Sequence, residues 1–164
     1  MSNYQLAQLN IARLKAPLDS PELKDFVDNL DRINALAEAS PGFVWRLKGD
    51  GNDATALRPM GEDVIVNMSV WQDVESLKNY VYRSPHVEIL KRKREWFSRM
   101  AESHMALWWV PQRHQPTVTE AAMKLMVLRE KGPSPAAFTF GAAFAAPDAP
   151  QANAPFSFRD SCPA

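Results

Sequence analysis

The residue best suited to acid–base chemistry is His86, which follows Ser84-Pro85 at a predicted helix start. At about 100° per residue, His86 falls in the same arc as the apolar Ile89 and Leu90. An imidazole in such a setting could act as a general acid or base, or could ligate a haem iron. It could equally pack and hydrogen-bond a backbone carbonyl, or cap the helix. Both interpretations stay open at the level of the sequence.

Polar side chains on predicted strands form a second candidate group, because a buried polar group must find a partner. They are Asn10, Arg46, Asn67 and Ser69. In a cleft between sheet and helices, the amides and the guanidinium could hold a substrate oxygen or carboxylate. They could also bond one another across adjacent strands, or face water.

The stretch from Val64 to Leu77 must position several of these residues. It predicts a buried strand that ends in Trp71 and turns into an amphipathic helix beginning near Asp73. Alternation along the strand places Asn67, Ser69 and Trp71 on one face and the valines on the other.

The predicted elements follow the order strand–helix–strand–strand–helix–strand. The strands are expected at 4–14, 43–47, 64–71 and 105–110, and the helices at 21–39 and 73–100, with a break at Ser84-Pro85. This order is typical of a ferredoxin-like α+β fold with an antiparallel four-stranded sheet. Its helices cover one sheet face, and the second face, which is also apolar, predicts a homodimer. In the second strand, Phe43, Trp45 and Leu47 are expected to share a face.

The chain is expected to divide into three parts. Residues 1–111 form the ferredoxin-like domain, and residues 112–140 form a helical extension that packs on it, with Thr117 or Thr119 as the helix cap. Residues 141–164 are rich in alanine and proline and are expected to be loosely ordered.

Composition excludes several classes of partner. Nineteen basic residues balance nineteen acidic ones, which argues against a nucleic-acid or anionic-membrane surface. There is no apolar run of the roughly 20 residues that a membrane helix needs, and no signal peptide is recognisable. Cys162 is the sole cysteine, so a reducing cytoplasmic location is expected. His104 and His114 lack the spacing of a metal site, and Arg83, Arg92 and Arg94 are expected on a solvated face.

Two motifs resemble those of the dimeric α/β-barrel superfamily, which includes antibiotic-biosynthesis monooxygenases and haem-degrading monooxygenases. They are Ser40-Pro41-Gly42-Phe43, and Val70 to Leu77 followed by Tyr80 and Ser84. Residues 4–140 more closely resemble the uncharacterised family called domain of unknown function 3291. The segments that carry this second resemblance are 6–13, 40–47, 67–71, 82–86, 94–97 and 108–111, the last running into His114, Pro116 and Thr117.

The superfamily resemblance implies candidate catalytic residues. Cofactor-free monooxygenases of this kind work with Asn, Trp and Tyr near an oxidisable phenol, which implies Asn67, Trp71 and Tyr80 here. Haem-degrading members carry their ligand histidine further along the helix, near Leu90, so His86 is a displaced candidate. The sequence is compatible with a haem-dependent protein and equally with one that uses no cofactor. No metal site is expected.

We therefore expect a monooxygenase-like protein that binds an aromatic or polyketide-like small molecule between sheet and helices. The catalytic candidates are His86, Asn67, Trp71 and Tyr80, and the substrate-binding candidates are Asn10, Arg46, Ser69, Tyr82 and Trp108. Trp108 and Trp109 are adjacent, so only one of them can face such a pocket. The alternatives are a non-catalytic ligand-binding or assembly module, and a cofactor-free lyase or isomerase.

Overall fold

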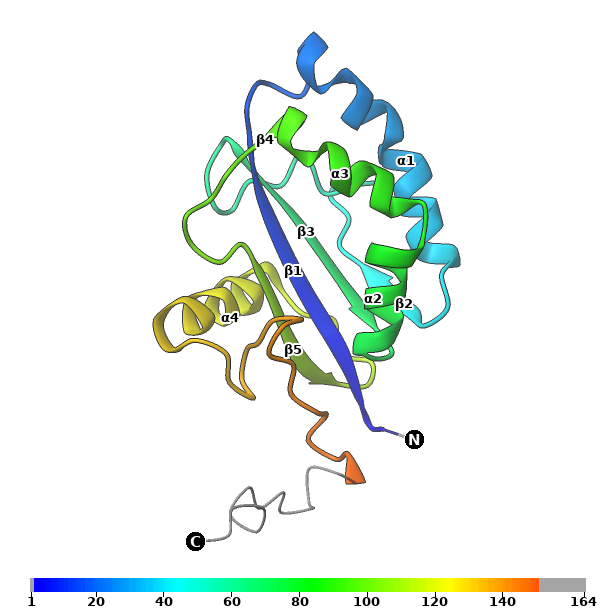
Figure 1. Ribbon diagram of the computed structural model, residues 1–164, viewed down its shortest axis with the longest axis vertical. Helices are drawn as coiled ribbons and strands as arrows, with labels where there is room; N and C mark the ends of the chain where they lie inside the picture. Colours follow the sequence, from blue (N-terminus) through cyan, green and yellow to red (C-terminus); the bar gives the residue numbers. More distant parts are fainter. Residues whose placement is uncertain (1, 151–164) are drawn as a thin grey trace, which may run out of the picture.

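The computed structural model describes residues 2–150 (Figure 1). The strands are β1 Tyr4–Leu14, β2 Phe43–Arg46, β3 Val64–Trp71, β4 Phe97–Ser98 and β5 Met105–Pro111. The helices are the 3₁₀ turn η1 Pro21–Leu23, followed by α1 Lys24–Ala39, α2 Val74–Arg83, α3 His86–Trp96 and α4 Val118–Lys131.

The sheet is antiparallel and is built around β1. Strand β3 pairs with one edge of β1 and β5 with the other, while β2 lies outside β3. The predicted ferredoxin-like α+β fold is confirmed. One strand goes beyond the prediction: β4 pairs with the end of β1, where Arg13 lies opposite Ser98. The sheet therefore has five strands rather than four.

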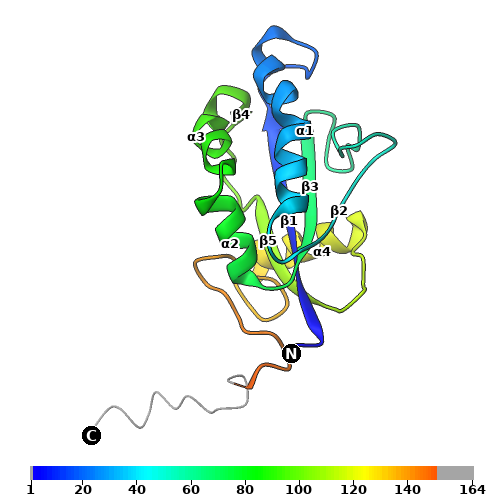
Figure 2. The same ribbon diagram turned by 90° about the vertical axis from the view of Figure 1, so that its right-hand side faces the viewer.

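The two sheet faces carry different helices. Helices α1, α2 and α3 lie on one side of the sheet, and α4 lies on the other (Figures 1 and 2). Because side chains alternate along β1, Leu6 packs with the first set of helices, whereas Leu9 and Ile11 pack with α4. The chain thus has a core on each face of the sheet.

The second sheet face is covered within the chain itself. Leu9, Met68 and Trp108 on this face are each at most 2% exposed. Leu125 and Leu128 of α4 belong to the same hydrophobic cluster. The sequence predicts a homodimer because this face should be free, and that reason does not hold because α4 occupies it. The dimer itself stays a prediction.

An irregularity in β2 changes which of its side chains share a face. Phe43 lies opposite Trp71, but Trp45 lies opposite Val70, so the register shifts between them. Phe43 packs edge-on against Trp71, whereas Trp45 contacts the cluster on the α4 side. The prediction that Phe43 and Trp45 share a face is wrong, because the bulge turns one of them over. Arg46 points to the side covered by α1, where its Nε donates to Glu38.

The turn into β2 depends on Gly42. Its φ is +83°, and a Cβ at this position would lie 2.2 Å from Ser76 Oγ in α2. The Gly42 carbonyl also accepts a hydrogen bond from the Gln72 backbone N–H at 2.7 Å. The start of β2 and the start of α2 are therefore tied closely together, which a side chain would prevent.

The predicted helix break at Ser84-Pro85 is confirmed. Helix α2 ends at Arg83, and α3 begins at His86. The Ser84 hydroxyl accepts a hydrogen bond from the His86 N–H at 3.2 Å and donates to the Tyr80 carbonyl. This arrangement fixes His86 in the first turn of α3.

The segment after β5 packs on the sheet through α4. Thr117 caps α4, its hydroxyl accepting from the Glu120 N–H at 3.1 Å. After α4, Phe138 exchanges two backbone hydrogen bonds with Leu107 of β5, at 2.8 and 2.9 Å. The extension is therefore joined to the sheet as well as packed on it.

The next ten residues are also attached. Trp109 Nε1 donates to the Phe144 carbonyl at 2.8 Å, and the Asp148 carboxylate accepts from the Asn3 N–H at 2.6 Å. The prediction of a loose tail from Gly141 does not hold for residues 141–150, because these contacts anchor them. Residues 151–164, with Cys162, lie outside the described residues.

Candidate functional site

A cavity of about 520 Å³ lies between the sheet and helices α1, α2 and α3. We call it the sheet–helix cavity. Residues predicted for the site that line it are Asn10, Arg46, Asn67, Ser69, Trp71, Tyr80, Tyr82 and His86. A space of this size suits one drug-sized molecule.

Trp108 does not line the sheet–helix cavity. It lies opposite Ala7 of β1, on the face that α4 covers, and is 1% exposed. The predicted substrate contact of Trp108 is therefore corrected, because alternation along β5 turns it into the other core. Trp109 faces the side of the sheet that carries α1 and α2, where it packs against Phe138.

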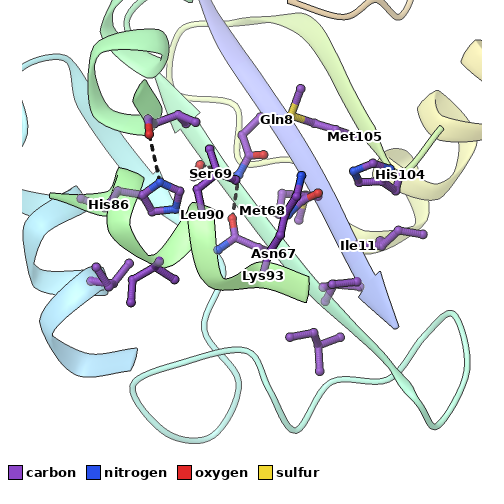
Figure 3. Close-up of a pocket in the computed structure, with 18 of the residues that line it drawn as sticks. Gln8, Ile11, Asn67, Met68, Ser69, His86, Leu90, Lys93, His104 and Met105 are labelled. Atoms are coloured by element: carbon purple, nitrogen blue, oxygen red, sulfur yellow. Dashed lines mark hydrogen bonds between the residues drawn. The ribbon is translucent and has the colours of Figure 1, made fainter. Parts of the chain in front are cut away.

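Three polar side chains on β1 and β3 are joined by hydrogen bonds (Figure 3). Gln8 Nε2 donates to Asn67 Oδ1 at 2.7 Å and to Ser69 Oγ at 2.9 Å. Ser69 Oγ also accepts from Trp71 Nε1 at 2.8 Å. Gln8 and Ser69 are direct cross-strand partners, which makes these bonds possible. The polar groups thus bond one another and also line the cavity, so both sequence interpretations hold together.

Asn67 is the most accessible member of this group. Its side chain is exposed, whereas those of Gln8 and Ser69 are buried. Because Oδ1 of Asn67 accepts from Gln8, its amide NH₂ is left to donate to another partner. Asn67 can therefore present a hydrogen-bond donor to a molecule in the cavity.

Aromatic rings form a continuous row beside the polar group. Trp71 stacks on Tyr80 with centroids 5.1 Å apart, and Tyr80 contacts the His86 ring at 4.8 Å. The Tyr80 hydroxyl donates to the Ile33 carbonyl at 3.2 Å, and burial raises the pKa of Tyr80. Tyr80 is thus a neutral phenol, and its stacking defines one wall of the cavity.

His86 combines burial with one fixed nitrogen. Its Nδ1 lies 3.2 Å from the Val81 carbonyl, which can only accept, so Nδ1 carries the proton (Figure 3). Burial lowers the pKa of His86, outweighing the opposite effect of this hydrogen bond. The ring is therefore neutral near pH 7, and Nε2 has a free lone pair. This is the tautomer that a general base requires.

Arg46 is held by partners on two sides. Its Nε donates to Glu38 Oε1 at 2.7 Å and its Nη2 donates to Asn52 Oδ1 at 2.9 Å. The Arg46 side chain is only 8% exposed, while Glu38 is 42% exposed. Arg46 therefore connects β2 with α1 and the loop after β2, and much of its charge is balanced by Glu38.

The far end of the cavity contains basic residues that the sequence analysis does not assign to the site. Lys93, Arg94 and His104 all line it. Arg94 is exposed, as the sequence predicts, and it also lines the open end of the cavity. The signal was present for α3, since Lys93 follows His86 by seven residues and so shares its face. No sequence pattern indicates His104, which precedes β5.

The donor groups also bear on cofactors. His86 lines the cavity and its Nδ1 bonds a backbone carbonyl, which leaves Nε2 as the nitrogen that could hold a haem iron, so His86 fits that role. Within residues 2–150, no three His, Cys, Asp or Glu side chains are grouped to hold a metal ion. None of the helices in this part of the chain is long and apolar enough to cross a membrane.

Solved structures with a similar chain path share little sequence with this protein. A protein of unknown function from Nitrosomonas europaea is 13% identical, with 70% of this chain and 95% of that chain covered and a TM-score of 0.44. SnoaB, a cofactor-independent oxygenase from Streptomyces nogalater, is 15% identical, with 70% and 97% covered and a TM-score of 0.42. The monooxygenase ActVA-Orf6 of Streptomyces coelicolor, solved with nanaomycin D, is 12% identical, with 70% and 93% covered and a TM-score of 0.42.

Similarities of this size establish no shared activity. A search of curated proteins gives no match. One family model, described as domain of unknown function (DUF3291), matches residues 5–154, which is most of the chain. This confirms the family resemblance seen in the sequence motifs, and the chain belongs to the DUF3291 family.

Proposed function

We propose that this protein is a monooxygenase-like enzyme that binds an aromatic or polyketide-like molecule in the sheet–helix cavity. The observation that carries the proposal is the neutral His86, whose Nε2 is free beside a row of aromatic rings and a cavity of about 520 Å³. An apolar cavity with a few convergent polar groups and a titratable residue of shifted pKa is the usual form of a small-molecule site.

The proposed chemistry begins with a proton transfer to His86. Nε2 takes a proton from an acidic phenol or from a CH₂ group next to an aromatic ketone. The Asn67 amide donates a hydrogen bond to the substrate oxygen on which the negative charge develops. The electron-rich anion then reacts with dioxygen, so that a CH₂ becomes a carbonyl and the second oxygen atom leaves as water.

The remaining predicted site residues shape the cavity in this proposal. Trp71 and Tyr80 form its stacked wall, and Ser69 holds the indole of Trp71 in place. Asn10 and Tyr82 line the space, and Tyr82 lies at the rim, where it is 51% exposed. These residues position an aromatic ring by contact, and none of them exchanges a proton.

Haem dependence is a second form of the same proposal, favoured by the Nδ1–Val81 hydrogen bond. His86 would ligate the iron through Nε2, and Lys93 and Arg94 are cations suited to pair with the propionates. The haem would supply dioxygen activation when bound. Haem titration followed by absorption spectroscopy decides the point: a Soret shift lost in His86→Ala supports haem binding, and no shift leaves the cofactor-free form.

The test of the proposal is dioxygen consumption with a hydroxyanthrone, which has an acidic CH₂. We expect His86→Gln to lower kcat by about 10²- to 10⁴-fold, the usual contribution of a general base. His114→Gln is the matched control, because His114 pairs with Glu120 outside the cavity. Equal loss in both variants, or none in either, would contradict the proposed role of His86.

The same experiment separates the alternatives. Tight binding of the hydroxyanthrone without dioxygen consumption would favour a non-catalytic binding module. Turnover of a carbon acid without dioxygen would favour a lyase or isomerase. Homodimer formation and a cytoplasmic location stay predictions from the sequence, and light scattering of the purified protein tests the first.

A further inference from the structure

The sheet–helix cavity has chemically different ends. His86 lies in the first turn of α3, and Lys93 follows it on the same face after seven residues, about 10 Å along the helix axis. Figure 3 shows His86 at one end of the view and His104 at the other, with Lys93 between them. Among the residues of α3 that line the cavity, the positively charged ones, Lys93 and Arg94, lie at the end of the helix away from His86.

The basic groups at this end lack acidic partners. Among the described residues, neither Lys93 nor Arg94 forms an ion pair within 4.0 Å. Their neighbour Arg92, in contrast, pairs with both Asp25 and Glu95 at 2.8 Å. Two positive charges at a cavity wall therefore have no carboxylate within 4.0 Å among residues 2–150.

The cavity also contains few carboxylates that could balance these positive charges. Asp53 is the one acidic residue among the described residues that line it. Its Oδ1 already accepts from the Thr55 N–H at 2.8 Å and from the Thr55 hydroxyl at 2.6 Å. The excess of positive charge at the far end is therefore not cancelled by the walls.

The positive charges of Lys93 and Arg94 affect the pKa of His104. Burial lowers its pKa first, and the positive charges of Lys93 and Arg94 lower it further. All three side chains line the cavity, and Lys93 and Arg94 lie close enough to His104 to act on it electrostatically. An anion placed there would meet two cations and one imidazole.

We propose that this end of the cavity binds a carboxylate of the ligand, and that the substrates are aromatic or polyketide-like acids. The inference rests on the proposed function for the aromatic part of the ligand. Arg94 offers a planar fork that matches a carboxylate, and Lys93 adds a second charge. The aromatic body then extends along Leu90 toward His86, which receives the reacting end of the molecule.

The test compares two ligands of the same shape, 2-naphthoate and 2-naphthamide, by isothermal titration calorimetry. We expect the wild-type protein to bind the acid at least tenfold more tightly than the amide, a difference of about 1.4 kcal/mol. The preference should shrink as salt concentration rises, because the cationic end is open to solvent. Lys93→Gln combined with Arg94→Gln should abolish it.

The control is Lys91→Gln combined with Arg99→Gln, which removes the same charge from exposed positions outside the cavity. This variant should keep the preference for the acid. If the first double variant fails to fold by circular dichroism, Lys93→Met alone replaces it, since methionine keeps the aliphatic part of the side chain.

The outcomes separate the two proposals. Equal affinity for acid and amide in the wild-type protein would overturn the carboxylate site and leave the aromatic cavity intact. Loss of the preference in the control variant would also overturn it, by assigning the effect to overall charge. No binding of either compound would overturn the proposed function itself.

Discussion

Ser69 Oγ accepts a hydrogen bond from Trp71 Nε1 at 2.8 Å, joining two residues that stand two positions apart on the same face of β3. Gln8 Nε2, from the neighbouring strand, donates to the same oxygen at 2.9 Å. One hydroxyl therefore satisfies two buried donors, and it also fixes the indole that forms the wall of the cavity.

Ser69→Ala should destabilise the protein through this shared oxygen. The indole N–H and one amide hydrogen of Gln8 would lose their partner in a buried setting, at about 1–3 kcal/mol for each buried donor left unsatisfied. Chemical denaturation followed by tryptophan fluorescence measures the change. Ser20→Ala is the control, because the Ser20 hydroxyl bonds only near the surface. A loss in Ser69→Ala no larger than in the control would contradict the shared role.

Gly42→Ala should be more damaging than an alanine at another loop glycine. The positive φ of Gly42 costs about 1–2 kcal/mol for an L-residue, and the new Cβ would collide with Ser76. Gly51→Ala is the matched control, since no atom lies within 4 Å of its added Cβ. Thermal unfolding measures both. A Tm for Gly42→Ala equal to that of the control would show that the turn can relax.

Leu125→Ala should reveal how much α4 contributes. Leu125 is 2% exposed and packs in the core on the second sheet face, so its truncation should cost about 2–5 kcal/mol. Met123, on the outer side of α4, is 63% exposed, and Met123→Ala should change stability by less than about 0.5 kcal/mol. Denaturant unfolding of both variants gives the comparison. Equal small effects would mean that α4 does not cover the sheet in solution.

The stability of the fold should depend on pH through His86. Its pKa in the folded state lies below the ordinary value, so the unfolded chain binds the proton more readily. Stability from this group is therefore complete above about pH 6.5, the ordinary pKa of histidine, and decreases as the pH falls below that value. His86→Gln should flatten the dependence between pH 7 and pH 5 in urea unfolding. An unchanged slope would show that His86 stays accessible to protons in the folded state.

The sequence could predict the site where local periodicity decides the direction of a side chain. Alternation in β3 places Asn67, Ser69 and Trp71 on one face, and the structure has them there. The role of Gln8 needs the cross-strand register of β1 and β3, which sequence alone does not provide. Trp108 illustrates the same limit: its parity relative to Trp109 is predictable, but which of them faces the helices is not.

Longer-range packing could not be predicted. The amphipathic pattern of α4 identifies Leu125 and Leu128 as buried, yet it does not say which surface buries them. The β2 bulge likewise turns Phe43 toward the helices, although strict alternation places it with Trp45. In both cases the outcome depends on the shape of a distant element rather than on local sequence.

The most direct test of the account is to fill the sheet–helix cavity. Leu90 lies on α3 and lines the cavity, so Leu90→Trp should occupy the space that the ligand needs. We expect Leu90→Trp to lose at least tenfold in affinity for a hydroxyanthrone by calorimetry while it keeps the fold by circular dichroism. A folded Leu90→Trp variant that binds the hydroxyanthrone as tightly as the wild-type protein would contradict the claim that this cavity is the functional site.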